Sequence, residues 1–118
     1  MSDRDRERPE TRPGDEIPEE VAAQMEDYRR RIDRLDEEIV RLLNVRAACA
    51  LEVGRLKDSV GMATHQPVRE VEVHEHVRKI NGGPLDPGAI RRLFERIIDE
   101  NRRLERLAKG DEEKPAGD

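Results

Sequence analysis

Aromatic residues are nearly absent from this sequence, whose 118 residues include one tyrosine, one phenylalanine and no tryptophan. A β-sandwich or barrel of this size needs bulky side chains in its core, so their scarcity argues against both folds. Strand-like alternation is almost absent as well. Charged residues make up 43% of the chain, a content typical of long amphipathic helices with solvated outer faces. The composition therefore predicts an all-α fold in a single domain.

Cysteine and long apolar runs are also scarce. Cys49 is the only cysteine, so the chain cannot form an internal disulfide, and we expect a small buried side chain in a reducing compartment. No stretch approaches the roughly 20 apolar residues of a membrane-spanning helix, and the first residues lack the apolar run of a signal peptide. Basic residues are interspersed with acidic ones and lack interleaved aromatics. We expect a cytoplasmic protein that binds neither nucleic acid nor membrane.

The chain divides into a helical domain and two polar ends. Residues 1–17 are charged and contain proline, residues 109–118 are polar, and neither segment has apolar periodicity. Both ends are therefore expected to be disordered. The domain between them, residues 18–108, contains the periodic apolar residues that a packed helical fold requires.

Proline and glycine mark three helices within this domain. The first is expected to begin near Pro18, with acidic residues in its first turn, and to run to about Ser59. The second opens at Pro67 and stops at the Asn-Gly-Gly-Pro cluster of residues 81–84. The third follows Asp86, which is an N-cap residue with proline at the next position.

A four-three repeat of apolar residues runs along the first helix, and we call it the apolar seam. Its members are Val21, Met25, Tyr28, Ile32, Leu35, Ile39, Leu42, Arg46, Cys49, Val53, Leu56 and Val60. Such a repeat is typical of a helix packed lengthwise against partner helices. A helix of this length spans about 60 Å. The two shorter helices together have roughly the same length, so neither can cover the full seam on both sides. The seam therefore predicts dimerisation along the first helix.

The two shorter helices carry apolar faces of their own. On the second helix the face is formed by Val68, Val71, Val77 and Ile80. On the third helix two polar residues continue the apolar stripe, which consists of Ile90, Leu93, Phe94, Ile97, Ile98, Asn101, Leu104 and Glu105. An unpaired buried carboxylate is costly. Glu105 is thus expected to be partnered, protonated or partly exposed near the helix end.

Arg46 is the only charged residue in the seam, and burying its guanidinium costs several kcal/mol unless an anion compensates it. Lys57 lies eleven residues further on, on nearly the same face and about 16 Å away along the axis. The two side chains can either pair with carboxylates of neighbouring helices or converge on one small anion. Arg29 lies about 25 Å before Arg46 and about a quarter-turn off that face. If Arg29 serves the same site, another subunit must supply it.

Two residues at the start of the second helix are further candidates. Arg69 and Glu70 lie where free backbone N–H groups favour polar ligands, although they could equally form an ion pair of the first turn. His74 and His76 point about 200° apart on a helix and lack a zinc-protease spacing, so we predict no metal site.

Three segments together resemble the all-helical class of chorismate mutases, over about residues 26 to 108. They are RRRIDRLDEEIVRLLNVRAACALEVGRLK, then QPVREVEV, then GPLDPGAIRRLFERIIDENRRLE. The combination of RxxIDxLDxxIxxLLxxR, VGxxK, PxRE and LFxxII is far more specific than a generic coiled coil. The resemblance implies an intertwined homodimer of three-helix protomers, two sites among the helices and no cofactor. It also implies conversion of chorismate to prephenate in aromatic amino-acid biosynthesis.

The resemblance assigns roles to matching positions of this sequence. Arg46, Lys57 and Arg69 match basic residues of the family site, and Arg29 matches the arginine that the family donates from the other subunit. Glu70 matches the carboxylate that receives the ring hydroxyl. Basic residues that hold a dianionic substrate suit an intramolecular rearrangement, because this reaction needs neither a nucleophile nor obligatory proton transfer.

Three positions depart from part of the family. Glu105 lies where some members have a glutamine that donates to the ether oxygen, and a glutamate can donate only when protonated. We therefore predict activity that declines as pH rises, with Glu105→Gln relieving the decline. Asn101 replaces a common serine, and its amide can still donate to a carboxylate. Gln66 replaces a common aspartate near the ring hydroxyl.

Other functions on the same scaffold stay open. Gln66 followed by proline is also similar to mutases that act on 4-amino-4-deoxychorismate, and an isochorismate pyruvate lyase is a related alternative. A non-catalytic helical dimer is the alternative from another class. Docking on another shikimate-pathway enzyme is a further possibility that the charged ends leave room for.

Overall fold

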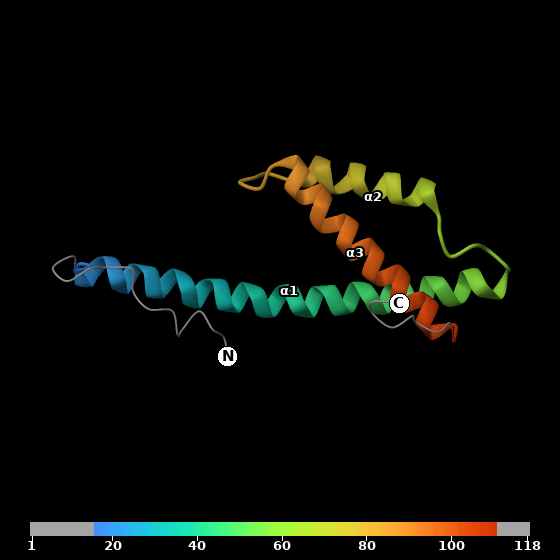
Figure 1. Ribbon diagram of the computed structural model, residues 1–118, viewed down its shortest axis with the longest axis horizontal. Helices are drawn as coiled ribbons and strands as arrows, with labels where there is room; N and C mark the ends of the chain where they lie inside the picture. Colours follow the sequence, from blue (N-terminus) through green and yellow to red (C-terminus); the bar gives the residue numbers. More distant parts are fainter. Residues whose placement is uncertain (1–15, 111–118) are drawn as a thin grey trace, which may run out of the picture. The chain divides into compact units, whose positions relative to one another are not determined.

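The computed structural model describes residues 16–110, and these fold into three helices with no strand among them (Figure 1). α1 spans Glu19–Ser59, α2 spans Pro67–Ile80 and α3 spans Pro87–Ala108. The predicted all-α class and the three predicted helices are confirmed. Each of the two shorter helices begins at the proline that predicted it.

The end of α1 is closed by a glycine in the left-handed region. Gly61 has a φ of 74°, which costs a residue without a Cβ little. The N–H of Gly61 donates to the carbonyl of Asp58 at 3.2 Å, and the N–H of Met62 donates to that of Lys57 at 2.8 Å. This pair of bonds is a Schellman motif, which satisfies carbonyls that the helix leaves free. The motif places Lys57 in the last turn, directly before the loop to α2.

The start of α3 is capped as the sequence predicted. The Asp86 carboxylate accepts a hydrogen bond from the backbone N–H of Ala89 at 2.7 Å. The preceding turn is held by Asn81, whose amide donates to the Leu85 carbonyl at 2.7 Å. Together these bonds set the direction in which α3 leaves α2.

The chain forms two units by its internal contacts, Met1–Ile39 and Val40–Asp118. In the first unit the described residues form the amino-terminal part of α1, where Arg30 pairs with Asp27 one turn earlier. Of the predicted polar ends, the structure describes only the last two residues of the first and the first two of the second.

In the second unit α2 packs against α3. The buried apolar side chains there are Val73 and Val77, which are one turn apart on α2. This corrects the predicted face of α2, because Val68, Val71 and Ile80 are exposed in the single chain. Most of the predicted stripe of α3 is half-buried and Glu105 is buried, although Leu93 is exposed.

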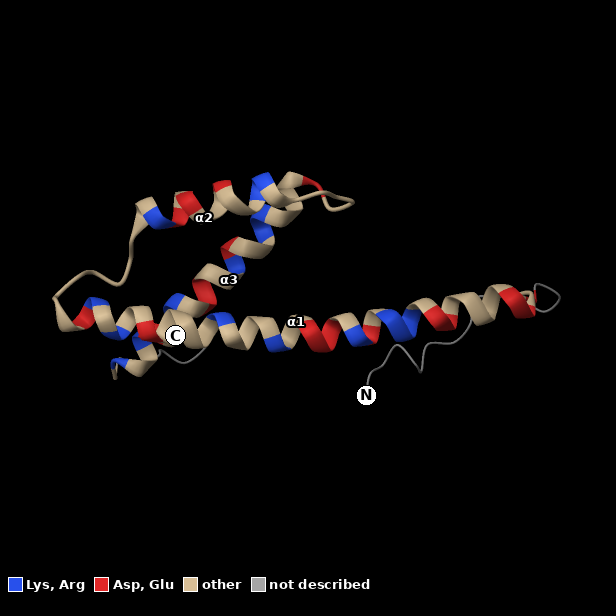
Figure 2. Ribbon diagram, turned by 180° about the vertical axis from the view of Figure 1, so that it is seen from behind, with Lys and Arg blue, Asp and Glu red and all other residues tan. Residues whose placement is uncertain are grey.

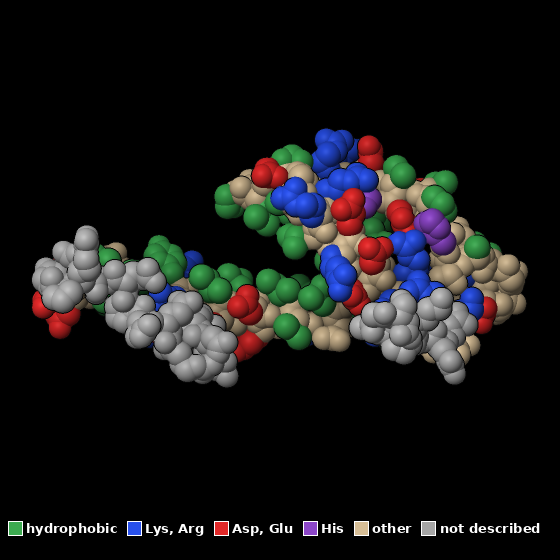
Figure 3. Space-filling view, in the orientation of Figure 1, with side chains coloured by type: hydrophobic (Ala, Val, Ile, Leu, Met, Phe, Trp, Pro, Cys, Tyr) green, Lys and Arg blue, Asp and Glu red, His purple; other side chains and the backbone are tan. Residues whose placement is uncertain are grey.

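The apolar seam of α1 is uncovered in the single chain. Every apolar seam residue is exposed, whereas Arg46 is partly buried. Cys49 was expected to be buried and is exposed instead. Figure 3 shows hydrophobic side chains on the surface along α1. A row of apolar side chains of this length in water is the mark of an interaction face.

Among residues 16–110, no helix is both long and apolar enough to cross a lipid bilayer.

Candidate active site

A pocket of about 290 Å³ lies within the second unit, between the carboxyl-terminal part of α1, the loop to α2, and helices α2 and α3. Seven of the eight site residues predicted from the sequence line it, and these are Arg46, Lys57, Gln66, Arg69, Glu70, Asn101 and Glu105. The eighth, Arg29, belongs to the first unit and is not among the lining residues. Side chains that are far apart in the sequence thus converge on one cavity.

Arg46 enters the pocket from α1 and meets α3. Its Nη1 donates to the side-chain oxygen of Asn101, so its hydrogen-bond partner is a neutral amide rather than a carboxylate. Burial lowers the pKa of Arg46, and the positive charge of Arg69 lowers that pKa further. Both effects destabilise the charged form of Arg46 relative to water. A bound anion would offset them by pairing with the guanidinium.

Lys57 and Glu105 face each other across the inner end of the pocket. Lys57 Nζ lies 3.9 Å from Glu105 Oε1, and the two side chains are 15% and 10% exposed. The same Nζ donates to the Thr64 carbonyl at 3.0 Å, which ties the lysine to the loop before α2. Glu105 is therefore shielded from solvent. The alternative that it is partly exposed near the helix end was wrong. A carboxylate this well shielded interacts strongly with whatever occupies the pocket.

The burial of Glu105 depends on a glycine in α1. A Cβ built on Gly54 would lie 3.1 Å from Glu105 Cγ and 3.2 Å from its carboxylate carbon. The missing side chain therefore lets the glutamate of α3 lie directly on the backbone of α1. Gly54 is the glycine of the VGxxK motif, three residues before Lys57, so the motif places the lysine and the space for its partner together.

Glu70 is held at the opposite side of the pocket by two basic side chains. Its Oε2 lies 3.2 Å from Arg102 Nη1 and 3.4 Å from His65 Nε2. The neighbouring Arg69 contacts Glu72 on its own helix at 3.4 Å. The alternative of an ion pair between Arg69 and Glu70 in the first turn of α2 is therefore not what the structure contains.

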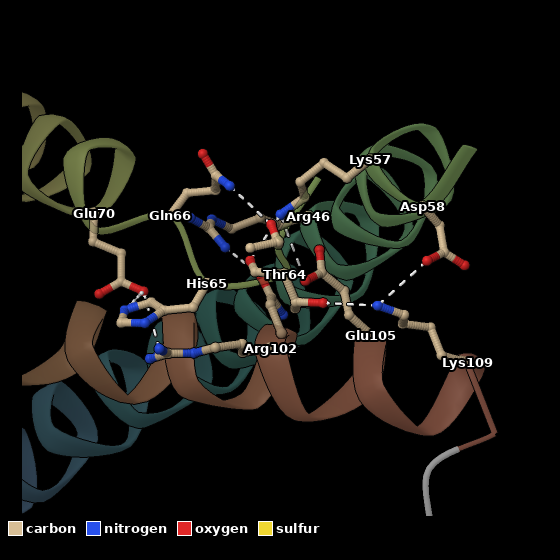
Figure 4. Close-up of polar contacts among 12 residues, drawn as sticks. Arg46, Lys57, Asp58, Thr64, His65, Gln66, Glu70, Arg102, Glu105 and Lys109 are labelled. Atoms are coloured by element: carbon tan, nitrogen blue, oxygen red, sulfur yellow. Dashed lines mark hydrogen bonds and ion pairs between the residues drawn. The ribbon is translucent and has the colours of Figure 1, made fainter. Parts of the chain in front are cut away.

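The loop between α1 and α2 is tied to the end of α3 (Figure 4). Lys109, at the end of α3, donates to Thr64 Oγ1 at 3.1 Å and lies 3.4 Å from Asp58 of α1. Gln66 donates its side-chain amide to the Ala63 carbonyl at 2.8 Å. These contacts hold in place the segment that closes one side of the pocket.

Sequence reasoning missed three polar residues of the site. Arg102 and Thr64 line the pocket, and His65 contacts Glu70. Arg102 lies beside the predicted stripe of α3, directly after Asn101, and only its position relative to α2 reveals its partner. Thr64 sits in a loop, where no helical or strand period applies. His65 lies in the same loop, so the same reason applies to it.

The charge of the pocket is positive. Four basic side chains line it, those of Arg46, Lys57, Arg69 and Arg102, against the carboxylates of Glu70 and Glu105. Figure 2 shows that basic residues occur on all three helices, so no single helix supplies the charge. Among residues 16–110 there is no group of three or more His, Cys, Asp or Glu side chains that could hold a metal ion. The pocket is suited to a small organic anion.

Comparison with known families agrees with this arrangement. The family model for chorismate mutase type II matches residues 28–106, a range that includes every lining residue named above. The chain belongs to the chorismate mutase type II family. The recognition made from the sequence motifs is thereby confirmed.

Individual relatives extend the comparison. The structure of chorismate mutase (form II) from Thermus thermophilus is 34% identical, with a TM-score of 0.68, and the match covers 70% of this chain and 93% of that one. A bifunctional chorismate mutase/prephenate dehydratase of Aquifex aeolicus is 36% identical over 90 residues, which are 73% of this chain. The chain spans about a quarter of the length of that relative. The chorismate mutase of Methanocaldococcus jannaschii is 26% identical, and the match covers 68% of this chain and 82% of that protein.

Proposed function

We propose that this chain catalyses the rearrangement of chorismate to prephenate in the biosynthesis of phenylalanine and tyrosine. One observation carries the proposal. Arg46 and Lys57, eleven residues apart on α1, line one pocket together with Glu70 of α2 and Glu105 of α3. Membership of the chorismate mutase type II family supports the same substrate. The proposal needs no cofactor.

The reaction places particular demands on such a pocket. One C–O bond breaks and one C–C bond forms within a single molecule, so no nucleophile or cofactor takes part. The catalyst has to hold a flexible dianion in its compact conformer and to stabilise the negative charge that develops at the ether oxygen. Fixed cations around a partly dry cavity meet both demands, because their attraction for the anion is less screened there than in water.

The roles are those that the family resemblance implies for the matching positions. Arg46 binds one substrate carboxylate, and Lys57 binds the ether oxygen and the carboxylate near it. Glu105, 3.9 Å from Lys57, donates to the ether oxygen when it is protonated. Glu70 accepts the bond of the ring hydroxyl.

The other polar lining residues complete the substrate contacts. Arg69 assists at a carboxylate, Asn101 binds a carboxylate through its amide, and Gln66 lies near the ring. The second substrate carboxylate is assigned to Arg29 of the partner subunit.

A homodimer is part of the proposal. The exposed seam of α1 includes Tyr28, Leu35 and Leu56, each more than half exposed in the single chain. Burying apolar area of this kind contributes about 25 cal/mol per Å², and two seams packed lengthwise would cover each other. A site that needs Arg29 would give the first unit a part in catalysis. The cytoplasmic location and a contact with another shikimate-pathway enzyme stay predictions.

Chorismate turnover is the first test. Loss of chorismate absorbance is followed with purified protein, and prephenate is identified by its acid conversion to phenylpyruvate. We expect Arg46→Ala to lose at least about a hundredfold in kcat/KM, because a charge that binds the substrate carboxylate is removed. Arg55→Ala is the matched control, since Arg55 is an exposed arginine of the same helix that pairs with Glu52.

The outcomes separate the alternatives. Equal turnover in wild type and Arg46→Ala would remove this pocket from the reaction. A wild type inactive on chorismate would be assayed with 4-amino-4-deoxychorismate and isochorismate, and turnover of either would assign the related activity. Inactivity on all three, with the fold intact by circular dichroism, would favour the non-catalytic dimer.

Mixing two inactive variants tests whether the site is shared between subunits. Arg29→Ala and Arg46→Ala each damage every site in their own homodimers. After unfolding and refolding in equal amounts, half of the dimers are mixed, and each mixed dimer has one intact site. About a quarter of the wild-type activity should therefore return. No recovery, despite mixed dimers shown by native mass spectrometry, would assign Arg29 and Arg46 to the same subunit's site or remove Arg29 from it.

A further inference from the structure

Arg102 of α3 is the charged lining residue that neither the motifs nor the family roles account for. It is one of the four cations of the pocket, yet its described contacts are all to protein carboxylates. Its Nη1 lies 3.2 Å from Glu70 Oε2, and its Nη2 lies 2.7 Å from Asp99 Oδ1. The guanidinium thus bridges a carboxylate of its own helix and one of α2.

This bridge differs from the other arginine pairs of α3. Arg96 pairs with Glu100 at 2.7 Å on the helix surface and is 77% exposed, whereas Arg102 is 24% exposed. Exposed ion pairs contribute little to stability, because both side chains remain mobile and their charges are screened by water and salt. A planar guanidinium with two carboxylate partners and little freedom fixes the groups it contacts far better.

Glu70 has no comparable support from its neighbours in the sequence. Arg69 is 71% exposed and pairs with Glu72. The other contact, His65, is 55% exposed and 3.4 Å away. Both Arg102 and His65 approach the same oxygen, Oε2, so the carboxylate is held from one side.

We propose that Arg102 is a positioning residue that orients the Glu70 carboxylate toward the ring hydroxyl of the substrate. This inference rests on the proposed function and extends it to a residue outside the predicted site. Arg102 holds Oε2, and Oε1 accepts the bond from the substrate. This orientation favours a substrate that has a hydrogen-bond donor at that ring position. It also lowers the number of unproductive ways in which the substrate can bind.

A double-mutant cycle tests the proposal. Arg102→Met keeps much of the side-chain length and removes the charge, and we expect it to lower kcat/KM for chorismate by about tenfold. In a Glu70→Gln background the same change should lower kcat/KM less than about twofold, because the group that Arg102 positions is already altered. Arg102→Lys should recover part of the loss. Arg96→Met, which removes a surface arginine from the same helix, should leave turnover unchanged.

Three results would overturn the proposal. An equal loss in both backgrounds would mean that Arg102 acts on the substrate directly or only on stability, and unchanged turnover in Arg102→Met would mean that it does not act at all. A crystal structure of Arg102→Met supplies a readout independent of turnover. There the Glu70 carboxylate should leave the position that it has beside residue 102, and an unchanged position contradicts the proposal even if the wild type proves inactive on chorismate. Failure of the proposed function appears separately, as absence of turnover in the wild type.

Discussion

The two units of this chain use the same kind of helix in different ways. In residues 16–39 the charges pair along the helix surface, as Arg30 does with Asp27, and Arg31 lies over the Tyr28 ring at 5.1 Å. In residues 40–110 the important charges reach between elements, as Arg46 does to Asn101 and Arg102 to Glu70. Local pairs stabilise a helix by only a few tenths of a kcal/mol. Contacts between elements create a site.

The comparison shows how a chain with little core can still build a partly dry pocket. The buried side chains of the described residues are those of Val73, Val77 and Glu105. The cavity is held together by polar contacts and by the close approach of α3 to Gly54 rather than by a large hydrophobic core. The apolar side chains that would form a core lie in the seam instead, and in the proposed dimer the first unit contributes mainly its seam.

The largest expected effect comes from breaking the seam in the first unit. Ile32→Asp places a carboxylate among apolar side chains, where an unpaired charge costs several kcal/mol. If the two units act as proposed, the dimer dissociates and turnover falls at least about a hundredfold, because the partner's Arg29 is lost. Sedimentation equilibrium and the chorismate assay measure the two effects.

Gln24→Asp is the control, since it introduces the same carboxylate on the same part of α1 beside the seam. It should keep the dimer and its turnover. A monomeric Ile32→Asp protein with full activity would show that the second unit suffices for catalysis. It would contradict the proposed division of roles between the two units.

A smaller effect is expected from one carboxylate in the second unit. The decline of wild-type kcat/KM with rising pH that the sequence predicts depends on Glu105 as the donor to the ether oxygen. Glu105→Gln donates at every pH and should remove the decline. Glu100→Gln, on the outer part of α3, should keep the wild-type profile. An unchanged profile in Glu105→Gln would exclude Glu105 from the mechanism.

The smallest effect concerns Gly54. In Gly54→Ala the new methyl group meets Glu105 at 3.1 Å, so the glutamate has to shift by a few tenths of an ångström. Alanine favours a helix over glycine by about 1 kcal/mol, which offsets the crowding. We expect an unchanged or slightly raised melting temperature together with a several-fold loss of kcat/KM. Gly88→Ala in α3, where the nearest atoms lie at 3.4 Å, is the matched control, and equal turnover in both variants would contradict this account.

Much of the fold and part of the site could be predicted from local signals. Pro67 and Asp86 indicated two helix starts, because each acts on the backbone within one turn. The predicted face of α2 was partly wrong, since Val73 rather than Val68 and Val71 is buried with Val77. Helical period locates a face only to within about a quarter-turn, and the neighbouring helix decides which part of it is covered.

The sequence by itself determined the three helices, the apolar seam and the placement of Arg46 and Lys57 on one face of α1. These properties follow from residue spacing along a regular helix. Only the tertiary structure decided that Glu105 is buried against Gly54, that Lys57 meets Thr64, and that Arg102 holds Glu70. Such contacts join residues from different elements, so they depend on how the helices cross and on how the loop between α1 and α2 closes, which no local pattern specifies.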